Sequence, residues 1–481
     1  MANLQQLLAT ELRRRTELLP REIDAWNDQS DANKYGMGLH QSQVKVVTKL
    51  FSTMLAEQDA LKEKLDPKEV ATMPQDTFTS KRMELEQMLT GSHSIMSIFR
   101  YIFSQRDATQ PYGGILDAAD LVAAACYLPC VKLHNRWKVL PEENYREPPL
   151  TYLNAKLSPA AITRRHYFGS IGLELQGEEE LQLPLSVISL AFHDTTGFWE
   201  LSSIYHEVGH LLTQDLKLRD DLRKAMETKL AGRAKLDDWK RWLNEMIADA
   251  FGVLLGGAGF ARGLFAMLYK TKAEVLAASG VGEHPNSYVR VFLLGALLRS
   301  TGVAELQTLA DTIEGDWRNF YGPADATLKP YVDDCGAVAD VLMSEPLPVL
   351  EKDRCLLDFA RDKTSGVNSA PDLEKDNRYA AALARFIRLG KMSNDYNEAM
   401  LQPADLIRLV PAAAQLAVQG VDAEHEQKFE DIHKAALELT LRLQKEAKIE
   451  FLAGEDTGAR DAYLDGLIKQ VNFKAIRIDQ P

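Results

Sequence analysis

Apolar residues recur every three to four positions along most of this chain. Such spacing predicts amphipathic or buried helices rather than strands. The pattern is clear in residues 44–61, 83–103, 116–128, 260–276, 288–300 and 422–446. Pro67, Pro74 and the Thr90-Gly91-Ser92 cluster interrupt it and predict breaks between helices. The first 108 residues are therefore predicted to form helices, with His93 as a surface or capping residue beside a break.

The character of the chain changes between Thr151 and Phe192, where short β-like runs replace the helical pattern. Two runs, residues 167–175 and 183–192, flank three consecutive glutamates and predict a hairpin-like connection. The second run has two open interpretations, either the edge strand of a sheet above a cleft or an internal strand. The proline-rich and charged segment 141–149 predicts a linker before this region.

The fold class predicted from these patterns is mainly α, with a small β-sheet (α+β). The linker and the breaks predict three units. They are an N-terminal helical unit (residues 1–148), a mixed unit (149–300) and a C-terminal helical unit (301–481). In the last unit, residues 422–446 predict an amphipathic helix with His425 and His433 facing solvent.

Composition restricts the classes of partner. A formal net charge of −13 argues against a nucleic acid held through its phosphates. The N-terminus shows no secretory hydrophobic region, and no run of about twenty apolar residues indicates a membrane span. We therefore expect a cytoplasmic protein without a transmembrane segment. The four cysteines lack zinc-ribbon spacing and are predicted to be reduced, half-buried thiols: Cys126, Cys130, Cys335 and Cys355.

The clearest candidate chemistry lies in the stretch 202–216, where His206, Glu207 and His210 form an H-E-x-x-H sequence. Apolar residues around it recur at helical spacing, so the stretch is predicted to be a helix with a buried stripe. Residues four apart share one helix face, so both imidazoles can bind one cation with Glu207 beside it. Zinc normally requires a third protein ligand as well.

A second apolar-periodic segment supplies the candidate for this third ligand. A metzincin would need Gly and His where this chain has Thr213 and Leu216, which excludes that family. Glu245 lies among apolar neighbours, where an uncompensated carboxylate would be costly, so we predict it as a ligand. Asp249 follows one helical turn later and could accept the second N–H of a ligand histidine.

The two motifs together resemble the gluzincin zinc peptidases, in which H-E-x-x-H is followed by E-x-x-A-D on a later helix. The segment His284-Pro285-Asn286-Ser287-Tyr288-Val289-Arg290 further resembles the H-P-x-x-x-x-R sequence of the CAAX prenyl endopeptidases and HtpX-type proteases. The likeness covers roughly residues 188–298 and implies a zincin-like catalytic unit. It also implies that His284 and Arg290 reach the active site to bind substrate or the oxyanion.

Those proteases are typically embedded in membranes, which this chain is not predicted to be. His284 has an alternative role, since it could merely precede a helix that Pro285 opens. The run Gly256-Gly257-Ala258-Gly259 lacks a following Lys-Ser/Thr and is predicted as a helix end and turn, not a phosphate loop.

These observations predict a zinc metallopeptidase in which Zn²⁺ binds His206, His210 and Glu245 and activates a water. Glu207 is the predicted general base. His284, Tyr288 and Arg290 are the unranked candidates for holding the oxyanion. The alternative is a regulatory or protein-binding module with little or no proteolysis, whose helical units bind a protein partner. Peptide or protein substrates are expected, and the sequence leaves endo- versus exopeptidase action open.

Overall fold

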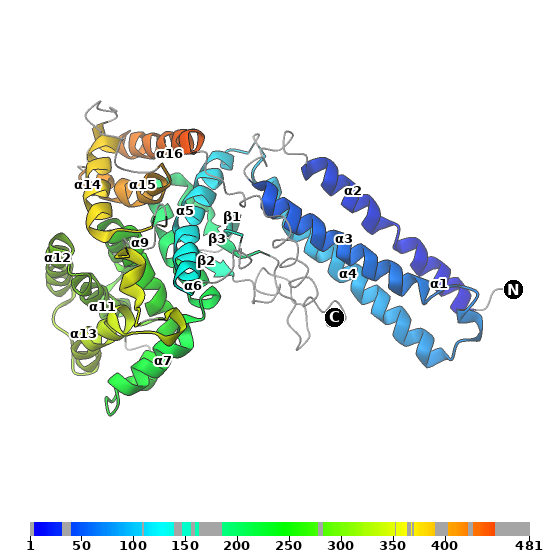
Figure 1. Cartoon of the computed structure of the whole chain (residues 1–481), viewed down its shortest axis with the longest axis horizontal. Helices are drawn as coiled ribbons and strands as arrows, with labels where there is room; N and C mark the ends of the chain where they lie inside the picture. The colour runs from blue at the N-terminus through cyan, green and yellow to red at the C-terminus, as the bar shows by residue number, and fades with distance from the viewer. Residues whose placement is uncertain are drawn as a thin grey trace.

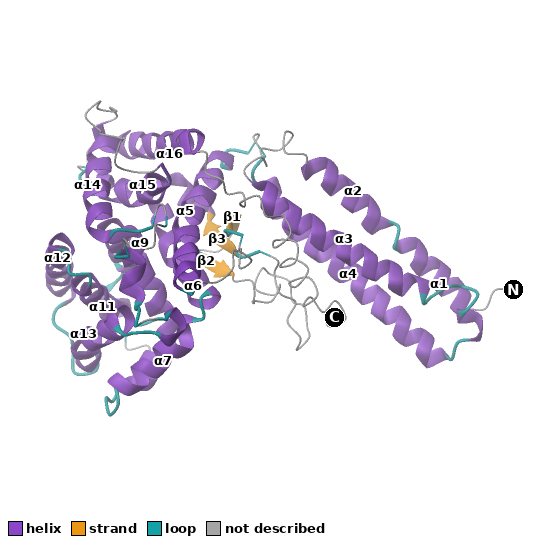
Figure 2. Ribbon diagram, viewed as in Figure 1, coloured by secondary structure: helices purple, strands orange, loops and turns teal. Residues whose placement is uncertain are grey.

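Helices make up most of the structure, a computed structural model, and a small three-stranded sheet lies among them (Figure 2). The predicted class, mainly α with a small β-sheet, is confirmed. The structure describes residues 4–30, 40–107, 110–138, 147–154, 159–162, 185–277, 282–351, 353–362, 367, 370–389, 403–421 and 427–447. The predicted strand at 167–175 and His425 lie outside these residues.

The first four helices form an elongated arm that projects from the rest of the molecule (Figure 1). They are α1 (Leu4–Arg15), α2 (Leu18–Ser30), α3 (Gln41–Glu63) and α4 (Gln75–Ser104). Their apolar faces share one hydrophobic cluster. Within it, the Trp26 ring meets Phe51 and Phe103 edge-on, with centroids 5.2 and 5.3 Å apart. The arm therefore has a core of its own, to which one part of the sheet contributes.

The predicted break at Thr90-Gly91-Ser92 is wrong, because α4 runs through it without interruption. Gly91 and Ser92 lie on the buried face of α4 within the arm, so tertiary packing outweighs the turn preference of these residues. His93 is consequently not beside a break. It lies within α4, and its Nδ1 is 2.5 Å from Glu22 on α2.

The sheet has the order β1-β3-β2, with β1 at Leu150–Asn154, β2 at Ala160–Ile162 and β3 at Val187–Ala191. Strand β3 pairs in parallel with β1 and antiparallel with β2. The internal interpretation of the 183–192 run is therefore the correct one, and the edge interpretation is wrong. In the described part of the chain, β2 is the strand at the edge nearer the H-E-x-x-H helix.

The larger body contains the remaining helices, which share a second hydrophobic cluster. Helices α5 (Gly113–Trp137), α6 (Ser203–Asp215) and α9 (Leu243–Leu268) lie near its centre. Around them lie α7 (Leu218–Lys229), α8 (Leu236–Arg241), α10 (Lys272–Leu276), α11 (Ser287–Ser300), α12 (Ala304–Tyr321), α13 (Lys329–Ser344), α14 (Leu373–Leu389), α15 (Pro403–Val418) and α16 (Gln427–Ala447).

The predicted unit boundary at residue 148 does not coincide with the division between the two clusters. Helix α5, which precedes it, packs into the same cluster as α6 and α9. The sheet contributes to both, with Tyr152 in the cluster of the arm and Leu153 in that of the body. The two clusters therefore meet at the sheet.

Two of the described helices, α5 and α9, are long and apolar enough to cross a membrane by length and composition alone. Most of each apolar window, 78% and 67%, is buried inside the protein. Since the core helix of a globular protein meets the same criterion, the absence of a transmembrane segment stays a prediction.

Two smaller predictions can be compared with the structure. The glycine run inside α9 does interrupt the helix, because Gly257 has a φ of 52° and the helix kinks there before continuing to Leu268. The four cysteines are free, but three are fully buried rather than half-buried, and only Cys355 is partly exposed. His433 on α16 is also partly buried rather than solvent-facing.

Candidate metal centre

Helices α6 and α9, which carry the two sequence motifs, cross at unusually close range. At the crossing, a methyl group at Gly209 would lie 2.8 Å from the Cα atom of Ala248 and 2.9 Å from its carbonyl oxygen. Such contacts are far inside the normal 3.5–4.0 Å between carbon atoms, so only glycine permits this approach. The crossing brings Glu245 on α9 opposite the histidines of α6.

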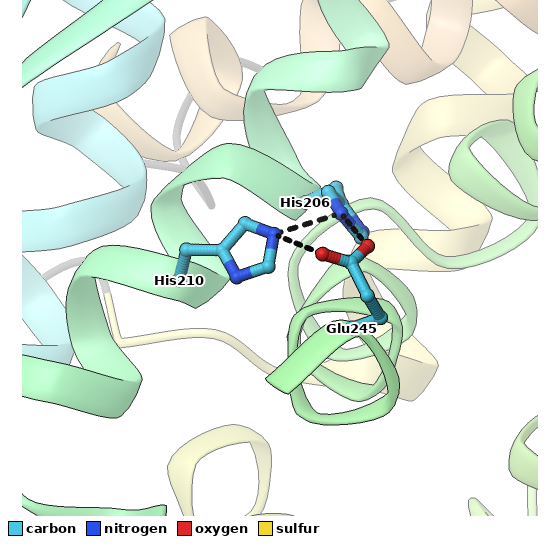
Figure 3. A group of neighbouring side chains, drawn as sticks. All are labelled: His206, His210 and Glu245. Carbon is cyan, nitrogen blue, oxygen red and sulfur yellow. Dashed lines mark hydrogen bonds and ion pairs between the residues drawn. The ribbon is translucent and has the colours of Figure 1, made fainter. Parts of the chain in front are cut away.

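Three predicted ligands converge between the two helices (Figure 3). The Nε2 atom of His206 lies 3.3 Å from Oε2 of Glu245, and Nε2 of His210 lies 3.4 Å from Oε1. The two Nε2 atoms are 3.1 Å apart, and the ring planes are nearly perpendicular at 89°. Figure 3 shows both imidazoles and the carboxylate pointing toward one another.

Asp249 holds the far side of the first imidazole, as the sequence predicts. Its Oδ1 lies 2.9 Å from Nδ1 of His206, which turns Nε2 of the same ring toward Glu245. Asp249 is itself held by Arg290, whose Nε and Nη2 each donate to one carboxylate oxygen at 2.7 Å. Bidentate pairing of this kind fixes orientation as well as charge.

This pairing favours a positioning role for Arg290. Its side chain is only 5% exposed, and its Nε and Nη2 atoms both donate to Asp249. The guanidinium lies 3.9 Å from the nearer oxygen of Glu245. Arg290 therefore positions Asp249, and through it His206, instead of facing a substrate.

Tyr288 is also not brought to the three ligands. Its hydroxyl donates to the carbonyl oxygen of Gly322 at 2.7 Å, and its ring packs on Phe292. His284, in contrast, reaches the group, since its Nε2 lies 3.0 Å from Oε2 of Glu245. With 59% of its side chain exposed, His284 lies where the cluster opens to solvent.

The electrostatics of the cluster favour a positive charge on His206 and a neutral His210. Burial opposes a charge on His206, but its hydrogen bonds with Asp249 and Glu245 raise its pKa to about 9. Burial and the neighbouring His206 lower the pKa of His210 to about 3. Burial likewise opposes the charge on Glu245, but hydrogen bonds from His206 and His284 hold its pKa well below the usual range. A cation bound here would displace the proton that charges His206.

Glu207 follows His206 on α6 and is buried, with 6% of its surface exposed. Burial raises the pKa of this carboxyl, while the charge of His206 and a hydrogen bond from the main-chain N–H of Ala161 on β2 lower it less. Because α6 lies against β2, the carboxylate next to the ligand pair is held by the edge of the sheet.

The donor set fits a zinc ion. Two imidazole nitrogens and a carboxylate are the ligands of many catalytic zinc sites. The histidine–aspartate pair behind them is the usual support for such ligands. The three donor atoms lie within 4.8 Å of one another, and none of the three residues is fully exposed.

Sequence reasoning missed the residues that position these groups. Asn286 caps the first turn of α11 by accepting from the amides of Tyr288 and Val289, and its side chain donates to the carbonyl oxygen of Ala277. An Asn directly before a helical run is a recognised start signal and could have indicated this. The contribution of Ala161 is made by its main chain, for which the sequence carries no signal.

Comparison with known proteins adds no family to this geometry. No protein-family model matches the chain, and no match was found among curated proteins or solved structures. The site must therefore be interpreted from its own chemistry.

Proposed function

We propose that this protein is a zinc-dependent metallopeptidase that hydrolyses peptide bonds. The observation that carries the proposal is the convergence of His206, His210 and Glu245 from two crossing helices, with Glu207 beside them. A site built only for structure would have no use for an unligated carboxylate next to its ligands. Structural zinc sites also tend to use a closed set of four ligands rich in cysteine. No described cysteine belongs to this group.

His206, His210 and Glu245 would hold the zinc ion, and Asp249 would keep His206 in the tautomer that leaves Nε2 free for it. When bound, zinc supplies a Lewis acid that polarises the scissile carbonyl and lowers the pKa of water. Glu207 would take the proton of the attacking water and pass it to the leaving amine. Its burial, which favours a carboxyl able to hold a proton, supports this role.

Among the described residues, no strand pairs with β2 on the side away from β3, which favours an extended peptide as the substrate. The N–H of Ala161 already faces Glu207, so such a peptide would use the other main-chain groups of β2 beside the site. An extended chain can add to such an edge through main-chain hydrogen bonds. A substrate bound in this way would lie next to Glu207.

Among the three predicted oxyanion candidates, the geometry favours His284. The hydroxyl of Tyr288 is bound to Gly322, and the guanidinium of Arg290 is bound to Asp249. His284 alone of the three combines contact with Glu245 and an exposed ring. An imidazole N–H directed at the tetrahedral oxygen would stabilise the charge that develops there.

The resemblance to gluzincins supports this assignment by motif. The geometry supports it independently for four residues, which are His206, Glu207, His210 and Glu245. The projecting arm favours a second hypothesis, in which the protein binds a partner and cleaves little or nothing (Figure 1). If the protein is a peptidase, we expect a narrow range of substrates. Bulk digestion of casein would contradict that expectation.

Metal analysis of purified protein tests the proposal first. We expect about one zinc per chain in the wild type and in Glu207→Gln, and loss of zinc in Glu245→Ala and His206→Ala. Glu207→Gln should abolish peptide cleavage in a peptide-library screen while zinc stays bound. Full zinc in Glu245→Ala would refute the ligand assignment. Activity retained by Glu207→Gln would refute the base. A wild type that holds zinc but cleaves nothing would favour the binding hypothesis.

A further inference from the structure

A buried polar cluster lies where the arm meets the body, at the edge of the sheet opposite to Glu207. Arg106, which follows α4, donates through Nε and Nη2 to Oδ2 of Asp120 on α5 at 3.0 and 2.7 Å. Both side chains are 3% exposed or less. Although burial opposes its charge, the guanidinium keeps the pKa of Asp120 below its ordinary value. The interior at this junction therefore holds a hydrogen-bonded ion pair.

This pair holds the main chain of β1 on both sides of one residue. The Oδ1 atom of Asp120 accepts from the amide of Thr151 at 2.6 Å and from its hydroxyl at 2.8 Å. Arg106 Nη2 donates to the carbonyl oxygen of Thr151 at 2.5 Å. At Thr151, the main-chain groups on the outer edge of β1 therefore bond to the side chains of Asp120 and Arg106, as they would to a neighbouring strand.

The strand register connects this anchor to the candidate base. Thr151 lies opposite Ile188 of β3, and Ile188 lies opposite Ala161 of β2. The main-chain N–H of Ala161 faces the Glu207 carboxyl and lowers its pKa. One row across the sheet, about 10 Å long at the usual strand spacing, thus has a carboxylate beside a main-chain N–H at each end.

We propose that Asp120 and Arg106 are positioning residues for Glu207, because they fix the row of the sheet that presents the Ala161 amide to it. This inference rests on the proposed role of Glu207 as the general base. Within the described ranges, the three residues of β2 pair with β3 and with no other strand, so the sheet gives β2 little other support. A sheet of three short strands depends on such anchoring for its order.

The same cluster includes His40 and Asp117, and its donors are close enough to raise the question of a second metal ion. Oδ2 of Asp120 already accepts hydrogen bonds from Nε and Nη2 of Arg106, and Nε2 of His40 lies 3.2 Å from it. A second divalent cation would be placed beside a permanent guanidinium charge. The cluster therefore suits an anchor better than a metal site.

Hydrogen exchange of the full-length, zinc-loaded protein tests the proposal, with the Ala161 amide as the readout. Asp120→Asn keeps the shape of the side chain but removes its charge. We expect the Ala161 amide to exchange about tenfold faster or more in this variant, because the row is no longer fixed. Thr151→Val, which removes only the hydroxyl donor, should give a smaller change of the same sign and serves if Asp120→Asn does not fold.

Gln105→Leu is the matched control. Gln105 holds both main-chain groups of Leu153 on the same strand at 2.9 and 2.7 Å. Leu153 lies opposite Leu190, which has no partner among the described residues of β2. Gln105→Leu should loosen β1 as much as Asp120→Asn does but leave the exchange rate of the Ala161 amide unchanged. Equal exchange at Ala161 in the wild type and a folded Asp120→Asn would overturn the proposal, as would an equal rise in Gln105→Leu.

Kinetics separate positioning from general stability. On any peptide that the wild type cleaves, Asp120→Asn should lower kcat about tenfold or more, with KM and zinc content unchanged. A lower zinc content with proportionate loss of activity would instead indicate a structural role and contradict the inference. If the wild type proves inactive, the proposed function fails, whereas the exchange experiment still decides whether Asp120 fixes the Ala161 amide.

Discussion

Gly209 provides a sharp test of the idea that the closeness of two helices builds the metal centre. In an ordinary helix, Gly→Ala adds about 1 kcal/mol of stability. Here the added methyl would lie 2.8 Å from the Cα of Ala248 and 3.0 Å from Cβ of Phe251, so α6 and α9 must separate by about an ångström. Backbone atoms cannot rotate away as a long side chain can. We expect a net loss of about 1–3 kcal/mol of unfolding free energy.

The same separation should weaken metal binding, because Glu245 moves with α9 while His206 and His210 move with α6. We expect Gly209→Ala to lower zinc affinity at least tenfold in a competition titration, and its thermal midpoint to fall. Gly336→Ala on α13 is the matched control, since a methyl there meets nothing within 4 Å. It should be neutral or slightly stabilising. Unchanged stability and zinc affinity in Gly209→Ala would refute the close-crossing argument.

Two further predictions concern buried charges. Burial and the charge of Asp120 raise the pKa of Asp117 from 3.8 to about 6, so stability should fall as pH rises from about 4 to 6 and then level off. Urea unfolding at several pH values should show that the wild type loses up to about 3 kcal/mol of unfolding free energy over this window relative to Asp117→Asn. Parallel plots of unfolding free energy against pH for the two proteins would contradict this. Arg408→Met should cost about 3–5 kcal/mol, because it leaves the buried Asp376 carboxylate without the donor now 2.8 Å away. Arg378→Ala, which breaks an exposed pair, should cost less than about 1 kcal/mol in the same denaturation assay.

The parts of the site that could be predicted from sequence are those that depend on one helix at a time. His206 and His210 share a face because of helical geometry alone, and Glu245 and Asp249 share another for the same reason. Even the pairing of Asp249 with His206 follows once the two faces meet. The sequence could not predict that these two helix faces pack against each other. That packing depends on Gly209 and joins two helices that residues 216–242 separate in the sequence.

Errors in the fold prediction arose where long-range packing outweighed local preference. The Thr90-Gly91-Ser92 cluster has the composition of a turn, yet all three residues are helical, and Gly91 and Ser92 lie on the buried face of α4. The edge or internal place of β3 depends on which strands pair with it, and one of these, β1, precedes it by more than 30 residues. No periodicity within β3 itself could decide that question.

The two ends of the segment that resembles H-P-x-x-x-x-R lie in different environments, and these environments favour different roles for His284 and Arg290. Its first residue, His284, lies in an exposed turn that the Trp242 indole fixes through the carbonyl oxygen of Gly282. Its last, Arg290, lies in the first turn of α11 and is buried on Asp249. The exposed end is free to contact a molecule that enters the site, while the buried end acts through Asp249, which it orients. Matching a motif therefore places both residues at the site, but only burial and pairing tell which of them can touch the reacting atoms.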